Sequence, residues 1–188
     1  LDGLHGWMRK AETLWEKHRS SEKFKLVELF DYFGQLTAQF PLTPLRIVYA
    51  ASGRNPAALV LRDPTAIIEH GNYWASASTE SEACYLVAIL NSETARARIE
   101  NLQARGQFGA RHFDKVIFNL PIPRFDAKDK THAALAKAAA EAERVAAAVE
   151  LPEGVKFQRA RAMIRAALAE AGVSQRIDAL VTELLDGA

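Results

Sequence analysis

The chain has 188 residues, of which 49% are hydrophobic and 25% charged, the balance of an ordinary globular protein with a sizeable core. Its 24 basic and 23 acidic residues leave a net charge of +1, so global charge does not indicate a dedicated nucleic-acid binder. No apolar run reaches the roughly 20 residues of a membrane span and no basic, apolar leader opens the sequence. We therefore expect a soluble, cytoplasmic protein.

The single cysteine, Cys84, excludes an internal disulfide and a cysteine-based metal cluster. It lies in an apolar segment, so we expect a small core residue and not a nucleophile. The first residue is Leu1 and not methionine, from which we expect that the chain begins inside a longer polypeptide.

The first forty residues are expected to form a helical lead-in. Apolar spacing predicts a short amphipathic helix over residues 7–19 and a second helix over residues 24–33. Gly34 is expected to end the second helix.

A small, twisted, mostly antiparallel sheet is expected next. Residues 45–50 and 57–62 are rich in strand-forming residues and flank turn chemistry, which predicts a hairpin. Residues 66–69 and 73–76 predict two further short strands, separated by a turn. Asn55 and Pro56 partly match the Asn-Pro-Pro-aromatic motif of adenine methyltransferases, but the second proline and the aromatic residue are missing, so this segment is interpreted as a turn.

A buried helix is expected to begin at Thr79, where Thr79 and Glu82 have the spacing of a reciprocal capping box. The following residues are apolar on nearly all sides, as in a helix surrounded by core. After an interruption at residues 91–92, a more polar helix is expected over residues 93–104. A loop over residues 106–113 and a strand over residues 115–119 follow, and the strand ends in an extended Leu-Pro-Ile-Pro stretch.

The rest of the chain is predicted to be helical. Apolar residues from 135 to 149 recur three and four apart, as in a coiled-coil seam. They are Leu135, Ala138, Ala142, Val145 and Val149. A further helix is expected to end at Gly172, and Ser174 is expected to cap the last one. The predicted fold class is α+β, with a mixed domain over residues 1–126, of which 1–40 are the lead-in, and a helical segment over 127–188.

The sequence lacks the motifs of nucleotide binding, zinc proteolysis and serine hydrolysis, and its five histidines lack metal-ligand spacing. One region has a local basic excess. Between residues 96 and 115 the basic residues are Arg96, Arg98, Arg105, Arg111 and Lys115, with His112 in addition, against Glu100 and Asp114. This is the one region of the sequence interpreted as a source of positive field.

The segment from Arg105 to Phe113 combines side chains that suit DNA. Gln107 can bind an adenine edge, and Arg105 and Arg111 can bind guanine or phosphate. Phe108 and His112 offer stacking faces. In the alternative interpretation, Phe108 and Phe113 anchor the loop on the core and the arginines are solvated. Arg96 and Arg98, on the preceding helix, can contact phosphate or be solvated or ion-paired.

Seven short segments, taken in order, resemble one family. They are Leu45–Tyr49, Ser52-Gly53 with Ala57-Ala58, Ile68–His70, Tyr73-Trp74, Glu82–Ser92, Gly109–Phe113 and Asn119–Pro123. This order resembles the C-terminal target-recognition region of large N6-adenine DNA methyltransferases of restriction-modification and phage-defence systems. The Tyr-Leu-x-Ala-x-Leu-Asn-Ser helix followed by Leu-Pro-Ile-Pro is also similar to the recognition modules of type I specificity subunits. The resemblance covers residues 42–126.

The resemblance implies that DNA recognition and methyl transfer belong to different parts of one protein. A fragment of this kind binds double-stranded DNA, while an upstream methyltransferase domain of the same chain binds S-adenosylmethionine and methylates an extruded adenine. No catalytic residue, metal or cofactor is expected within the fragment, because the matching motifs belong to the framework. An alternative of a different class is a protein–protein module that assembles a defence complex. An exposed apolar stripe on residues 131–149 or 174–185 would favour that alternative.

Overall fold

The computed structural model describes residues 2–53, 56–69, 71–103, 105–106, 109–110 and 116–187, with the backbone alone at 105, 106, 109 and 110. The α-helices are α1 (Asp2–His18), α2 (Leu26–Phe30), α3 (Glu80–Asn91), α4 (Glu93–Glu100), α5 (Lys130–Ala147), α6 (Phe157–Glu170) and α7 (Val173–Asp186). The strands are β1 (Arg46–Ala50), β2 (Ala58–Leu61), β3 (Asn72–Ser76), β4 (Arg105–Gly106) and β5 (Gly109–Ala110). Three short 3-10 helices, η1 (Tyr32–Gly34), η2 (Thr37–Gln39) and η3 (Val116–Asn119), complete the described elements. This arrangement confirms the α+β class.

The contacts divide the chain into two units, Leu1–Leu42 with Thr65–His70, and Thr43–Pro64 with Gly71–Ala188. The boundary expected near residue 127 lies inside the second unit, because α5 packs closely on α3. None of the helices in the described part of the chain has the length and apolarity required to cross a membrane.

The first unit contains the helical lead-in. The predicted helix over 7–19 is confirmed within α1, which begins earlier. The helix predicted over 24–33 ends at Phe30, because the Asp31 carboxylate accepts hydrogen bonds from the Leu36 and Thr37 amides and turns the chain. These backbone donors, Thr37 first, lower the pKa of Asp31.

The strand predicted at 66–69 is wrong. These residues form no strand, and the side chain of Gln39 binds Ile68 where a strand partner would. The Gln39 amide donates to the Ile68 carbonyl at 2.8 Å and accepts from the Ile68 amide at 2.8 Å. Gln39 is the one buried residue among those described in this unit. The Gln39 side chain therefore forms the hydrogen bonds that the Ile68 amide and carbonyl were expected to form with a neighbouring strand.

The second unit is built on an antiparallel sheet of order β2-β1-β3. The predicted hairpin is confirmed, since β1 pairs with β2 in the register Val48↔Leu59. The predicted strand at 73–76 is also confirmed, and pairs with β1 in the register Val48↔Trp74. Because β1 is central, its residues Ile47 and Tyr49 are buried in the core.

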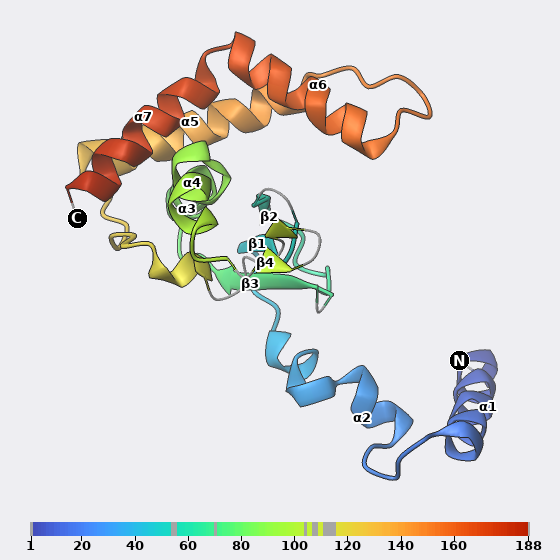
Figure 1. Ribbon diagram of the computed structural model, residues 1–188. Coiled ribbons are helices and arrows are strands. Elements are labelled where there is room, and N and C mark those ends of the chain that lie inside the picture. The colour runs from blue at the N-terminus through green and yellow to red at the C-terminus, as the bar shows by residue number, and fades with distance from the viewer. Residues whose placement is uncertain are drawn as a thin grey trace. The chain divides into compact units, whose positions relative to one another are not determined.

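Helix α3 is the centre of the second unit. In Figure 1 the sheet lies on one side of α3, and α5 and α7 lie on the other. The predicted burial of this helix is confirmed: Tyr85 and Ile89 have no exposed surface, and Cys84 is a buried thiol whose pKa is raised by desolvation. The predicted cap is confirmed in one half, because Thr79 accepts from the Glu82 amide. The Glu82 carboxylate, however, accepts from Ser78 and not from Thr79.

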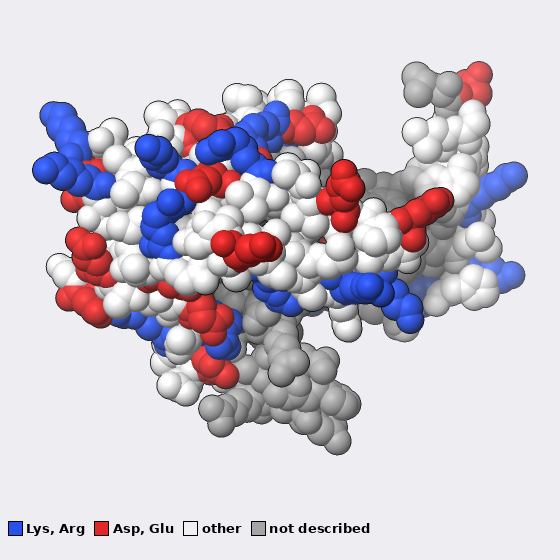
Figure 2. All heavy atoms as spheres, turned by 90° about the horizontal axis from the view of Figure 1, so that it is seen from above, with Lys and Arg blue, Asp and Glu red and all other residues white. Residues whose placement is uncertain are grey.

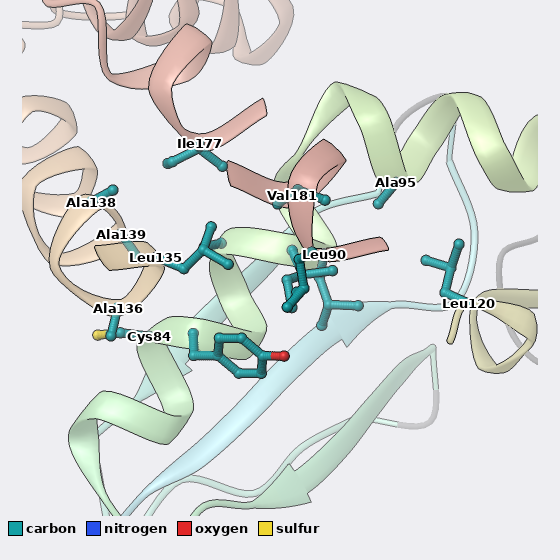
Figure 3. Packing of buried hydrophobic residues seen from close by; sticks show 14 of the residues in the cluster. Cys84, Leu90, Ala95, Leu120, Leu135, Ala136, Ala138, Ala139, Ile177 and Val181 are labelled. Atoms are coloured by element: carbon teal, nitrogen blue, oxygen red, sulfur yellow. The ribbon is translucent and has the colours of Figure 1, made fainter. Parts of the chain in front are cut away.

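The tail helices close the core. Leu135 of α5, Leu90 of α3 and Val181 of α7 point into one space between these helices (Figure 3). The seam of α5 is confirmed at Leu135 and Ala138, whereas Ala142 is half-buried at its edge. Burying this surface in a close-packed interior is the main favourable contribution to folding of the unit.

Two further predictions are wrong. Residues 116–119 form η3 and not a strand, because Asn119 folds back to donate to the Val116 carbonyl at 3.0 Å. Helix α7 begins at Val173, directly after Gly172 in the left-handed region at φ 69°, so Ser174 lies inside the helix and does not cap it. Gly172 also ends the preceding helix, because its amide donates a hydrogen bond to the Ala169 carbonyl of α6 at 3.0 Å.

Candidate nucleic-acid interface

The two framework motifs, the α3 helix and the Leu-Pro-Ile-Pro stretch, are joined by a partly buried hydrogen bond. The Tyr85 hydroxyl of α3 donates to the Pro123 carbonyl at 2.9 Å. Its ring lies 5.4 Å from that of Phe125 and 4.7 Å from that of His132, measured between centroids. Burial raises the pKa of Tyr85 to about 12, with a smaller contribution from the Asp129 carboxylate. The neutral hydroxyl therefore holds the extended segment against α3.

A second attachment comes from the first turn of α5. His132 is buried, and its Nδ1 accepts a hydrogen bond from the Asp126 amide at 3.0 Å. Asp129 caps α5 by accepting from the His132 amide at 2.9 Å and the Thr131 amide at 2.8 Å, and these bonds lower the pKa of its carboxyl. The stretch from Pro123 to Asp126 is thus held by both α3 and α5.

The junction between α3 and α4 is fixed by the Asn-Ser pair of the first motif. The Asn91 side chain accepts from the Ala58 amide at 2.8 Å and donates to the Ala58 carbonyl at 2.9 Å, so it occupies part of the outer edge of β2. Ser92 caps α4 by accepting from the Ala95 amide at 3.0 Å. One dipeptide therefore connects the sheet, α3 and α4.

Helix α4 is also bound to α7 at both ends. At its start, the Asp178 carboxylate accepts from the Glu93 amide at 2.8 Å and the Thr94 amide at 3.4 Å. At its end, Arg98 donates to the Leu185 carbonyl at 3.1 Å and pairs with Asp186. The two helices consequently run side by side in the same direction, and α4 cannot shift without breaking these contacts.

These attachments define the two ends of the segment over residues 104–115. Ile99 and Gln103 are buried before it, and Ile117 and Leu120 are buried after it. Within it, β4 and β5 pair in the register Arg105↔Ala110. The described residues on both sides of the segment are therefore anchored in the core, and the segment itself contains five of the seven predicted DNA-binding residues.

The predicted site residues divide into two groups. Arg96 pairs with Glu93 at 2.8 Å and with Glu100 at 3.1 Å, and the Glu93 hydrogen bond raises the pKa of its guanidinium. Arg98 is paired with Asp186, so the ion-paired interpretation holds for both residues. For Arg105 only the backbone is described, in β4. Four predicted residues lie outside the described residues: Gln107, Arg111, His112 and Lys115. Phe108 and Phe113, the expected anchors, lie outside them too.

An apolar cleft of about 620 Å³ lies inside the second unit, between β2, α3, α5, α6 and α7. Its apolar wall includes Val60, Val87, Ala142, Ile164 and Leu168. Arg161 and Arg165 of α6 are also among the lining residues. Neither the cleft nor the basic residues of α6 were singled out from the sequence, although four basic and no acidic residues occur between residues 154 and 169.

The described residues contain no cluster of three or more His, Cys, Asp or Glu side chains that could hold a metal ion. Figure 2, which shows the helices from above, has Lys and Arg interspersed with Asp and Glu over this face. The chain matches no protein-family model, no curated protein and no solved structure.

Proposed function

We propose that this chain is the DNA target-recognition part of an S-adenosylmethionine-dependent N6-adenine DNA methyltransferase of a cytoplasmic restriction-modification or phage-defence system. It binds duplex DNA for a catalytic domain located upstream in the same polypeptide. That domain extrudes the adenine and transfers the methyl group.

The hydrogen bond from Tyr85 to Pro123 is the observation that carries this proposal. It links the two motifs on which the resemblance rests, the Tyr-Leu-x-Ala-x-Leu-Asn-Ser helix and the Leu-Pro-Ile-Pro stretch. The segment between these motifs contains the basic and polar residues suited to DNA. A framework that fixes both ends of a glycine-containing segment is a sound basis for base recognition, because recognition requires side chains held in a defined position.

In this proposal, residues of the 104–115 segment enter the major groove. Gln107 is suited to an adenine edge, and Arg105 and Arg111 are suited to guanine or to phosphate oxygens. Arg96 and Arg98 have a structural role, because their guanidinium groups already pair with carboxylates of α4 and α7. We therefore assign base and phosphate contacts to the segment and not to α4.

The residues present do not fit S-adenosylmethionine. The described strands pair in antiparallel fashion, whereas nucleotide-type cofactors are bound by a parallel strand, a glycine-rich turn and a helix. The sequence also lacks the glycine motif and the Asn-Pro-Pro-aromatic motif of the catalytic domain. Cofactor binding and methyl transfer are accordingly assigned to the upstream domain of the parent protein.

Fluorescence anisotropy with a labelled random-sequence duplex tests the proposal. We expect weak binding at low salt that falls steeply as salt rises, because each phosphate contact releases counterions. Single-stranded DNA of the same length serves as the comparison. Absence of duplex binding by the folded chain at low salt would refute the proposed function.

A protein–protein assembly module is the second candidate, and one observation favours it. The first unit exposes Leu4, Trp7 and Phe33 at 66%, 58% and 82%, and exposed apolar groups of this size are typical of interaction surfaces. The stripes on α5 and α7 that were expected to decide the question are buried at Leu135, Val181 and their neighbours. Sedimentation velocity of the wild type and of Leu4→Ser/Trp7→Ser tests this candidate, which requires association that the substitutions abolish.

A further inference from the structure

The apolar cleft of the second unit is too large to be a packing defect. Protein interiors are close-packed and contain few voids larger than a water molecule. The cleft has a volume of about 620 Å³. Sites for small molecules are clefts of about 300–1,000 Å³ that are lined mainly by apolar side chains, with a few polar groups that orient the ligand. The cleft therefore has the size and the lining of a small-molecule site.

Two helices turn matching faces toward the cleft. The lining residues of α5 include Ala139, Ala142 and Ala146, and those of α6 include Arg161, Ile164 and Leu168. In both sets the residues are spaced three and four apart, so they lie on one side of their helix. At 1.5 Å per residue, each face is about 10 Å long. The cleft is consequently an elongated space between the two helices, bounded also by β2, α3 and α7.

Alanine residues leave this space open. The α5 side of the cleft presents three methyl groups, and β2 and α3 add the small residues Ala58 and Ala88. Elsewhere on α5 a large side chain, Leu135, fills the space toward α3 and α7 (Figure 3). A leucine at position 142 would occupy the cleft in the same way. The cleft thus follows from the small residues along one face of α5.

Most charged residues around the cleft are engaged within the protein. Glu143 pairs with Arg62, and Arg96 pairs with Glu93. The Asp178 carboxylate accepts from the Glu93 amide at 2.8 Å. These charges stabilise the fold and are not available to orient a ligand.

Arg161 differs from these residues. Among the described residues it has no acidic side chain within ion-pair distance, whereas Arg165, one turn later, has a partner in the protein. Arg161 is half-buried, and its guanidinium lies 5.4 Å from the centroid of the Phe157 ring. Since Phe157 is 72% exposed, this contact places the guanidinium where the cleft meets solvent. A guanidinium in this position is suited to a carboxylate, which it binds through charge-assisted hydrogen bonds.

We propose that the cleft binds a small aliphatic monocarboxylate, with the carboxylate at Arg161 and the apolar chain between α5 and α6. A single negative charge matches the guanidinium of Arg161. A phosphate group, with about two negative charges, would be repelled by the Glu143 and Asp178 carboxylates that also line the cleft. This inference goes beyond the proposed function and does not depend on it.

An extended peptide suits the cleft less well. A peptide that adds a strand to a sheet needs a free outer edge, which here is the edge of β2. The Asn91 side chain occupies this edge at Ala58, and Arg62, directly after β2, binds Glu143 of α5. Both ends of the edge are therefore engaged within the protein, which favours a small molecule.

Titration calorimetry of the whole chain with octanoate, below its micelle-forming concentration, tests the inference. Octanoate should bind saturably. Butanoate, which lacks four of its methylene groups, should bind about a hundredfold more weakly, because less apolar surface is buried. The uncharged analogue 1-octanol should bind about tenfold more weakly than octanoate, because it cannot form the charge-assisted contact.

Methyl resonances locate the site. In NMR spectra, octanoate should shift the methyl signals of Ile164 and Leu168, which line the cleft. The methyl signals of Ile99 and Ile117, which are buried outside the cleft, should not move. Saturable shifts that leave Ile164 and Leu168 unchanged would place the ligand elsewhere and overturn the inference.

Two variants separate the contributions of charge and space. Arg161→Gln should lower the affinity for octanoate about tenfold and leave that for 1-octanol unchanged. Its control is Arg159→Gln, at an exposed position of α6 outside the cleft, which should bind both compounds as the wild type does. Ala142→Leu should abolish the binding of both compounds, whereas Ala140→Leu, at an exposed position of α5, should not.

Absence of saturable octanoate binding by the folded wild type overturns the inference. Equal affinity of wild type and Arg161→Gln for octanoate also overturns it, and this comparison holds even if Ala142→Leu fails to fold. Tighter binding of an apolar peptide that carries no carboxylate would assign the cleft to peptides and overturn it too. Duplex binding is measured separately, so none of these results decides the proposed function.

Discussion

The hydroxyl of Tyr85 donates to the main-chain carbonyl of Pro123 at 2.9 Å, across 38 residues of sequence. This one bond connects the buried helix α3 to the extended segment that follows the proposed DNA-binding residues. Tyr85 has no exposed surface, so its hydroxyl depends on the Pro123 carbonyl for a hydrogen bond.

Tyr85→Phe should lower the free energy of unfolding by about 1 kcal/mol near neutral pH, because the Pro123 carbonyl loses its donor. The effect should depend on pH. The pKa of Tyr85 is raised to about 12 in the folded protein, against about 10 when unfolded, so native Tyr85 retains its proton longer. The contribution of protonated Tyr85 to the free energy of unfolding is fully present below pH 10. It decreases by about 1.4 kcal/mol for each pH unit as the pH rises toward 12.

The difference in stability between wild type and Tyr85→Phe should therefore shrink above pH 10 and reverse before pH 12. Urea unfolding at a series of pH values measures it. Tyr73→Phe is the control, because Tyr73 is 36% exposed on β3. A Tyr85→Phe difference that is constant across this pH range would contradict the burial of the hydroxyl.

The seam of α5 can be tested with two alanines one turn apart. Ala138 is 2% exposed, so Ala138→Glu should destabilise the protein by about 3 kcal/mol or more through an unpaired buried charge. Ala142 is half-buried on the wall of the cleft, where a glutamate can reach solvent, so Ala142→Glu should cost about 1 kcal/mol. Thermal and urea unfolding measure both variants. Equal losses would mean that the cleft does not accommodate the longer side chain.

Much of the fold could be predicted from local patterns. The hairpin of β1 and β2, the buried α3 and the α5 seam follow from residue spacing alone. The strand at 66–69 could not be predicted correctly, because Gln39 binds Ile68 from 29 residues away. The first turn of α7 was missed for a similar reason, since Gly172 replaces a side-chain cap with a left-handed turn.

The candidate site was predictable only in part. Basic residues are visible in a sequence, but their partners are not. Arg98 was grouped with DNA-binding residues because of its neighbours in sequence, yet its carboxylate partner Asp186 is 88 residues away. The opposite holds for Arg159, whose lack of an acidic partner among the described residues becomes evident only in three dimensions.

The attachment of α4 to α7 predicts a local effect of Asp178. Asp178→Ala removes the acceptor for the Glu93 and Thr94 amides and should cost about 1 kcal/mol, as for loss of a helix cap. Amide hydrogen exchange should accelerate at the start of α4 more than in α5. Glu183→Ala, at an exposed position of α7, is the control and should change neither. The same exchange rates in both variants would contradict the role assigned to Asp178.

The chain alone should bind no S-adenosylmethionine and transfer no methyl group to DNA, because the glycine and Asn-Pro-Pro-aromatic motifs are absent from its sequence. Titration calorimetry with the cofactor and a tritium-transfer assay with duplex DNA measure these two activities. An established methyltransferase domain provides the positive control. Saturable cofactor binding in the micromolar range would contradict the assignment of catalysis to an upstream domain.

Duplex binding by Arg105→Ala/Arg111→Ala, measured by fluorescence anisotropy at low salt, tests the proposed DNA-binding segment most directly. If both arginines contact phosphate, affinity should fall and the salt slope should become shallower by about one unit for each. If Arg111 reads a base, the loss should be about 1–3 kcal/mol on the target sequence and small on random DNA. Full wild-type affinity in the folded double variant would contradict the account and leave these arginines merely solvated.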